Sequence, residues 1–142
     1  MKNGNIKRKK VLNKIEVIET LNILFKKYEF AKVPFCVNDG LRTYGGKKIQ
    51  IGLKVLDYTV MTNMTDVVIH EFAHSFDYCK NNGYRRNKQN TKWVFHDKIF
   101  YDYLKEILLF AYDDIHSYDW GNEYYGIKKM YQKEFCQITI NS

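Results

Sequence analysis

The sequence is poor in the residues that interrupt or cross-link a fold. It has a single proline, Pro34, while aromatic residues make up 16%, which favours a compact and largely helical body. Its three cysteines (Cys36, Cys79 and Cys136) lie far apart with no Cys-x-x-Cys pair, which argues against a disulfide framework and for a reducing compartment. No apolar stretch has the length of a membrane span or of a signal peptide. We therefore expect a cytoplasmic protein, or the mature part of an exported one.

Positive charge exceeds negative charge, and the formal net charge is +7. Such a balance can indicate contact with nucleic acid or with a membrane surface. The lysines are spread along the chain, however, and the two dense runs, at residues 7–10 and 85–88, come without an RNA-binding or zinc-finger motif. We expect residues 1–10 to form a flexible basic N-terminus and the chain to be a monomer that contacts no membrane. A basic nucleic-acid-binding protein of a mobile element is an alternative.

The spacing of apolar residues divides the 142 residues into a short series of helices and strands. Alternation at residues 49–53 predicts a strand whose polar face is typical of a sheet edge. The predicted elements, in order, are a helix at 11–25, a short strand near 33–37, the strand at 49–53, and helices at 65–80, at 91–112 and from 127 onward. This order predicts one α+β domain over residues 1–142, with a small sheet and a mostly helical C-terminal half.

The stretch VVIHEFAHSFDYC, residues 67–79, places His70 and His74 four positions apart. On a helix these two side chains lie on one face, so both imidazoles can reach one tetrahedral zinc ion. Glu71 lies about 100° further around the axis, where it can act as general base on a water beside the metal. Its neighbours Phe72 and Ala73 are apolar, and burying three polar side chains among them is costly unless a metal binds them. The spacing therefore predicts one Zn²⁺ per chain.

A catalytic zinc site takes a third protein ligand, for which the sequence offers several residues. Asp77 shares the helical face, but its short side chain is better suited to orienting an imidazole. We expect Glu134 to be the ligand, because it lies in the last predicted helix among apolar neighbours. The other candidates are two histidines and several carboxylates: His96, His116, Glu106, Asp113, Asp114, Asp119 and Glu123.

HEFAHSFD resembles the zinc-binding helix of the gluzincin peptidases related to the anthrax lethal factor catalytic domain and to the Mlc titration factor peptidases. Those families also carry a downstream Tyr-x-x-x-Asn-x-x-Glu-Phe-Phe-Ala motif, in which Glu is the third ligand and Tyr helps to stabilise the oxyanion. Tyr118 and Asn122 match the start of that motif. Glu134-Phe135 matches its Glu-Phe nine residues later than the pattern has it, and Glu123 is the alternative ligand.

The resemblance implies a compact zincin-like, minimal gluzincin fold in which an edge strand lies beside the HExxH helix. KKIQIGLK, residues 47–54, is well placed to be that strand, and it would bind a peptide or protein substrate as an extended strand. The implied activity is that of a zinc metallopeptidase, an endopeptidase with Glu71 as general base and Tyr118 at the oxyanion. Tyr124, Tyr125 and Tyr131 are alternatives for the oxyanion role. A zincin-like binding or regulatory module without activity is the alternative.

Overall fold

The computed structural model describes residues 4–55 and 63–118. Within these residues the chain forms three α-helices, one 3₁₀ helix and a two-stranded sheet, which confirms the coarse α+β class. The elements are α1 (Lys14–Lys27), η1 (Glu29–Ala31), β1 (Phe35–Asn38), β2 (Ile49–Gly52), α2 (Met64–Lys80) and α3 (Lys98–Tyr112). The helix predicted from residue 127 onward, together with Glu123 and Glu134, lies outside the described residues.

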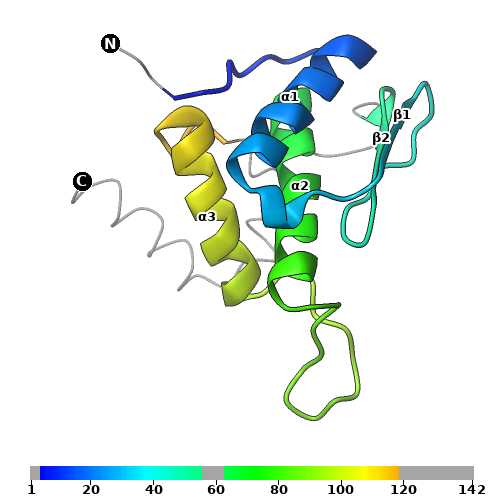
Figure 1. Cartoon of the computed structure of the whole chain (residues 1–142), viewed down its shortest axis with the longest axis vertical. Helices are drawn as coiled ribbons and strands as arrows, with labels where there is room; N and C mark the ends of the chain where they lie inside the picture. The colour runs from blue at the N-terminus through cyan, green and yellow to red at the C-terminus, as the bar shows by residue number, and fades with distance from the viewer. Residues whose placement is uncertain (1–3, 56–62, 119–142) are drawn as a thin grey trace.

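Helix α2 occupies the centre of the domain, with α3 on one side and the sheet on the other (Figure 1). Its N-cap is Asn63, whose side chain accepts a hydrogen bond from the backbone of Asp66, and the helix begins at Met64, one residue before the predicted start. The helix ends as predicted, with Asn81 as C-cap and Gly83 at positive φ. Among the described residues, no helix has the length and apolarity needed to span a membrane.

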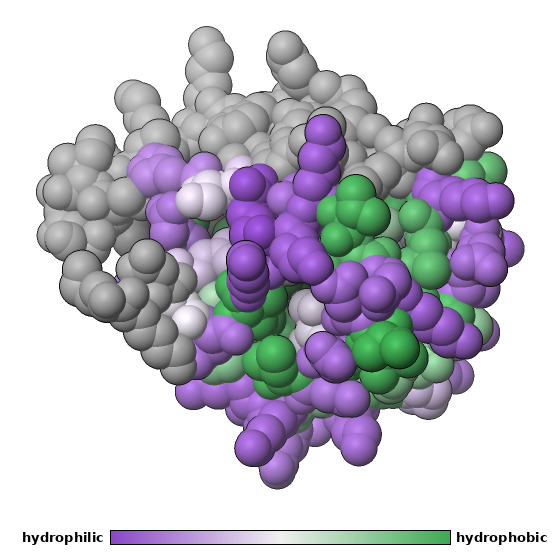
Figure 2. Space-filling view, turned by 90° about the horizontal axis from the view of Figure 1, so that it is seen from above, coloured by the Kyte–Doolittle hydropathy of each residue, from purple (hydrophilic) through white to green (hydrophobic). Residues whose placement is uncertain are grey.

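The apolar spacing of α1 predicted its buried face in part: of the residues with that spacing (Val11, Ile15, Ile18, Leu21 and Phe25), Leu21 and Phe25 are buried. Val17, Leu21 and Leu24 are fully buried, whereas Val11 and Ile15 are 70% and 66% exposed. The helix begins at Lys14 after a capping box on Asn13, so Val11 is not part of it. Seen from above, exposed hydrophobic side chains lie in separate small patches among hydrophilic ones (Figure 2).

The sheet continues beyond its two parallel strands. Tyr44 pairs antiparallel with Gln50 through two backbone hydrogen bonds, on the side of β2 opposite to β1. Next to it, Gly45 lies so close to α2 that a Cβ atom there would be 2.0 Å from the carbonyl oxygen of Glu71, and the amide of Gly46 donates to Ser75. The edge that touches the HExxH helix is therefore the segment 43–46, and β2, which we expected to be the edge, lies between this segment and β1.

The basic N-terminal segment, which we expected to be flexible, is hydrogen-bonded to two helices. The amides of Asn5 and Ile6 donate to the carbonyl of Ala111 at the end of α3. Arg8 forms an ion pair with Asp66 of α2, with 2.8 Å between the charged atoms. Residues 5–10 thus join the start of α2 to the end of α3.

Candidate metal centre

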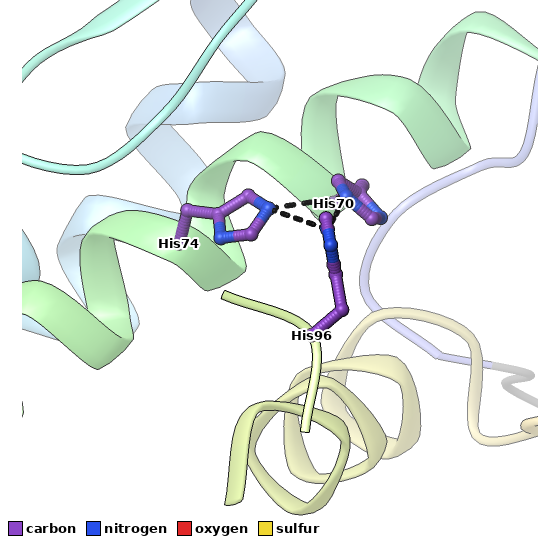
Figure 3. Close-up of side chains that lie close together, drawn as sticks. All are labelled: His70, His74 and His96. Atoms are coloured by element: carbon purple, nitrogen blue, oxygen red, sulfur yellow. Dashed lines mark hydrogen bonds between the residues drawn. The ribbon is translucent and has the colours of Figure 1, made fainter. Parts of the chain in front are cut away.

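Three histidine side chains converge on one point beside α2 (Figure 3). His70 and His74 project from α2, and His96 comes from the segment just before α3. Their Nε2 atoms form a triangle, with 3.2 Å from His70 to His74, 3.2 Å from His70 to His96 and 3.1 Å from His74 to His96. The four-residue spacing predicted that the first two rings would meet, and the third arrives from 22 positions further along the chain.

The donor set and its spacing fit a divalent metal ion that takes nitrogen ligands. Nitrogens that each lie about 2.0–2.1 Å from a tetrahedral zinc ion are about 3.3–3.4 Å apart, close to the separations in the triangle. Burial lowers the pKa of His74 well below its usual range, and the charges of His70 and His96 lower it further. This shift favours the neutral imidazole, which is the form that binds a metal.

Two aromatic residues hold the rings in place. Phe100, fully buried at the start of α3, stacks on His74 with 4.4 Å between ring centroids and also contacts the rings of His70 and His96. The hydroxyl of Tyr118 lies 3.0 Å from Nδ1 of His70. When Nε2 of His70 binds a metal, its Nδ1–H donates to Tyr118, and such a bond fixes both the tautomer and the ring orientation. Tyr118, expected at the oxyanion, thus contacts the edge of His70 opposite to the converging nitrogens.

An arginine with two aspartate partners lies beside the triangle. Arg85 donates to both carboxylate oxygens of Asp77 at 2.7 Å and to both of Asp97 at 2.8 Å. The bonds to Asp77 and then to Asp97 raise the pKa of Arg85 further above its ordinary value. Burial raises the pKa of Asp97, but the bonds from Arg85 and from the backbone outweigh burial and leave it lowered. Asp77, considered from the sequence as a residue that orients an imidazole, binds this arginine instead.

The triangle opens into a cleft of about 290 Å³. Glu71 lines the same cleft, which places a carboxylate on the side where a water or a substrate would meet a bound metal. The sheet-edge segment contributes Thr43, Tyr44 and Gly45 to the lining, and Phe95 contributes an aromatic ring. The arrangement can therefore bind a metal, offer a proton acceptor next to it, and place an extended backbone edge along the same cleft.

The third histidine is the part of the site that we did not select from the sequence. Within residues 4–55 and 63–118, the group of His, Cys, Asp and Glu side chains close enough to hold one ion is His70, His74 and His96. The available indication was Asp97, an N-cap residue type directly after His96. We predicted a helix from Thr91, and that prediction placed His96 inside the helix. In the structure His96 lies just before α3, which begins at Lys98. His116, the other histidine considered, is exposed and lies outside the group.

Comparison with known protein families, with curated proteins and with solved structures gives no match. The gluzincin resemblance therefore depends on the HEFAHSFD motif and the partial downstream motif, and the case for a function depends on the geometry of the histidine triangle and its cleft.

Proposed function

We propose that this chain is a zinc-dependent endopeptidase with Glu71 as its general base. One observation carries the proposal: three Nε2 atoms converge within 3.1–3.2 Å of one another, beside a cleft that Glu71 also lines. His70 is buried, His74 is half-buried and His96 is exposed. Without a metal, the three imidazoles would lie in contact although a neutral ring carries a single N–H to share. A metal ion replaces these imperfect contacts with three coordinate bonds.

We assign His70, His74 and His96 as the ligands. Three protein ligands leave one position of a tetrahedral zinc ion open, which is the arrangement of catalytic rather than structural sites. Phe100 and Tyr118 support this assignment, because they hold the rings with their Nε2 atoms directed to one point. Glu134 remains the ligand predicted from the sequence, and substitution can separate the two assignments.

The residues of the cleft divide the proposed reaction among them. A bound zinc ion would supply Lewis acidity, which lowers the pKa of water and polarises a carbonyl group. The carboxylate of Glu71 would accept a proton from the attacking water and pass it to the leaving amine. The segment 43–46 would align an extended peptide or protein substrate by main-chain hydrogen bonds. Tyr118 would orient His70, rather than take the oxyanion role that the resemblance implies.

The proposal is tested by measuring metal content and peptide hydrolysis on the same preparations. Wild-type protein should carry about one zinc ion per chain, as a mononuclear site requires. Glu71→Gln should keep its zinc while hydrolysis of a peptide library falls by ~10²–10⁴-fold, the usual contribution of a positioned general base. Glu19→Gln, an exposed change on α1, is the matched control and should cleave as wild type does.

The outcomes separate the parts of the proposal. Stoichiometric zinc in a protein with both His70→Ala and His74→Ala would overturn the metal site. A wild-type protein that binds zinc but cuts no peptide in the library would favour the inactive binding module. Cleavage by Glu71→Gln at the wild-type rate would exclude Glu71 as the base.

The third ligand has its own test. His96→Ala should lower zinc affinity far more than Glu134→Ala, because it removes one of three converging nitrogens. The reverse ranking would restore the assignment of Glu134 made from the sequence.

A further inference from the structure

The segment 84–97 joins α2 to α3 and carries His96 near its end. It contains two adjacent arginines in different surroundings. The side chain of Arg85 is 13% exposed and binds two aspartates. Arg86 is exposed, with its guanidinium over the ring of Trp93 at 4.4 Å. The contrast indicates that Arg85 has a role in the interior of the domain that its neighbour does not share.

Each of the two partners of Arg85 is close in the chain to a histidine of the triangle. Asp77 belongs to α2, three residues beyond His74, and Asp97 directly follows His96. The planar guanidinium makes four hydrogen bonds of 2.7–2.8 Å to these two carboxylates. A planar fork of N–H groups suits two carboxylates at once, which the point charge of a lysine cannot reproduce. Arg85 thus links the helix that carries two of the histidines to the residue next to the third.

Asp97 transmits this link to the site in two ways. It is covalently joined to His96, so its position limits where that imidazole can lie. It is also the N-cap of α3, because its side chain accepts a hydrogen bond from the backbone of Phe100 at 3.0 Å. Phe100 is the residue whose ring contacts all three histidines. A shift of Asp97 would therefore move the third imidazole and the ring that supports the other two.

We propose that Arg85 is a positioning residue of the metal centre: by binding Asp77 and Asp97 together, it holds Nε2 of His96 against those of His70 and His74. The effect on metal binding rests on the proposed function, whereas the placement of His96 is a property of the chain itself. Arg85 acts on His96 through Asp97. An ion pair that only stabilised the fold would leave the relative placement of the imidazoles unchanged in the folded protein.

The first test measures Zn²⁺ affinity by competition with a chelating dye. Arg85→Met should weaken binding by about 10–100-fold, the usual effect of removing a residue that supports a ligand. Arg85→Lys should recover only part of this loss, since it keeps the charge but not the fork. Arg86→Met is the matched control and should bind as wild type does. Adding Arg85→Met to His96→Ala should cost no further affinity, because the ligand through which Arg85 acts is already gone.

The second test needs no metal. In proton NMR spectra of the metal-free protein, contacts between the ring of His96 and the rings of His74 and Phe100 should be present in wild type and in Arg86→Met. They should be lost or weakened in Arg85→Met. If Arg85→Met does not fold, Arg85→Lys replaces it in both tests, with circular dichroism as the check on folding.

The results distinguish the two proposals. Unchanged zinc affinity and unchanged ring contacts in the Arg85 variants would overturn the positioning role and leave the metal centre standing. A full additional loss of affinity when Arg85→Met is combined with His96→Ala would also overturn it, because Arg85 would then act elsewhere. Ring contacts that depend on Arg85 in a protein that binds no zinc would support the positioning role and sink the zinc-peptidase proposal.

Discussion

The two ends of α2 carry the same pair of residue types with different consequences. Near the N-terminal end, Asp66 is bound by Arg8, and near the C-terminal end, Asp77 is bound by Arg85. In both pairs the guanidinium binds both oxygens of the carboxylate. Between the two pairs lie His70, Glu71 and His74, so each pair holds one end of the helix that supplies most of the site.

The difference lies in what else each pair contacts. Asp66 is fully buried and also accepts a hydrogen bond of 2.6 Å from Tyr112 at the end of α3, so this end joins three segments of the fold. At the other end, Arg85 also forms an ion pair with Asp97, which directly follows the proposed ligand His96. A buried ion pair is by itself weak evidence for stability, but removal of one partner is costly because the other charge is left buried. The neighbours of the pair decide what else that removal disturbs. We therefore expect substitutions at the N-terminal end of α2 to reduce stability, and substitutions at its C-terminal end to reduce metal affinity.

Asp66→Ala should have the largest effect and tests the first end directly. It leaves the hydroxyl of Tyr112 buried without its acceptor and Arg8 without its carboxylate, so unfolding free energy should fall by about 3 kcal/mol. Urea denaturation measures this loss. Zinc affinity of the folded protein should match wild type, and a strong loss of affinity would show that the two ends are coupled.

Tyr112→Phe should have the next largest effect. Burial, with the charge of Asp66, raises the pKa of Tyr112, so its hydroxyl stays protonated and donates to the carboxylate. Loss of one hydrogen bond to a charged group should cost about 1.5–3 kcal/mol of unfolding free energy, again without a change in zinc affinity. Stability equal to wild type would mean that Asp66 does not need the hydrogen bond from Tyr112.

Tyr118→Phe is the counterpart at the histidine cluster. It removes the hydroxyl that lies 3.0 Å from Nδ1 of His70 and leaves the shape of the side chain almost unchanged. Zinc affinity should fall by about 10-fold, because the tautomer and orientation of His70 are no longer fixed. Tyr112→Phe should thus lower the unfolding free energy in urea denaturation, whereas Tyr118→Phe should lower the affinity measured by zinc titration. A Tyr118→Phe protein with full affinity but a large loss of stability would contradict the orienting role.

Lys98→Ala should have the smallest effect and sets the baseline for charge pairs. Lys98 pairs with Asp102 across one turn on the exposed side of α3, with side chains 49% and 44% exposed. Solvent screens such a pair, so its loss should change unfolding free energy by less than about 0.5 kcal/mol and leave zinc affinity unaltered. A change comparable to that of Asp66→Ala would mean that burial does not distinguish these pairs.

The sequence predicted the features that depend on residues close together in the chain. The four-residue spacing of His70 and His74 and the end of the helix at residue 80 are both local features of α2, and the structure has this helix end and the meeting of the two rings. The alternation at residues 49–53 likewise predicted β2. The zincin-like fold and the peptidase activity remain proposals, because only the HEFAHSFD motif and the partial downstream motif carry the resemblance.

Features set by contacts between distant residues could not be predicted in this way. His96 joins the site because Arg85 and Asp97 fold the segment 84–97 back onto α2, and no periodicity encodes that contact. The sheet edge at 43–46 depends on the close approach of Gly45 to Glu71, which is a matter of packing between elements. Val11 was wrongly placed on the buried face of α1, because the helix begins only at Lys14, after the cap on Asn13.

The split of the triangle between one helix and a later segment has a consequence for how the chain folds. His70 and His74 come into place as soon as a single turn of α2 forms, whereas His96 lies 22 residues beyond His74 and arrives only when the intervening loop closes. Partly folded chains would therefore already offer a zinc ion two nitrogens. Because a ligand that also binds non-native states stabilises the native one less, zinc should raise the melting temperature by less than its affinity for the complete triangle implies.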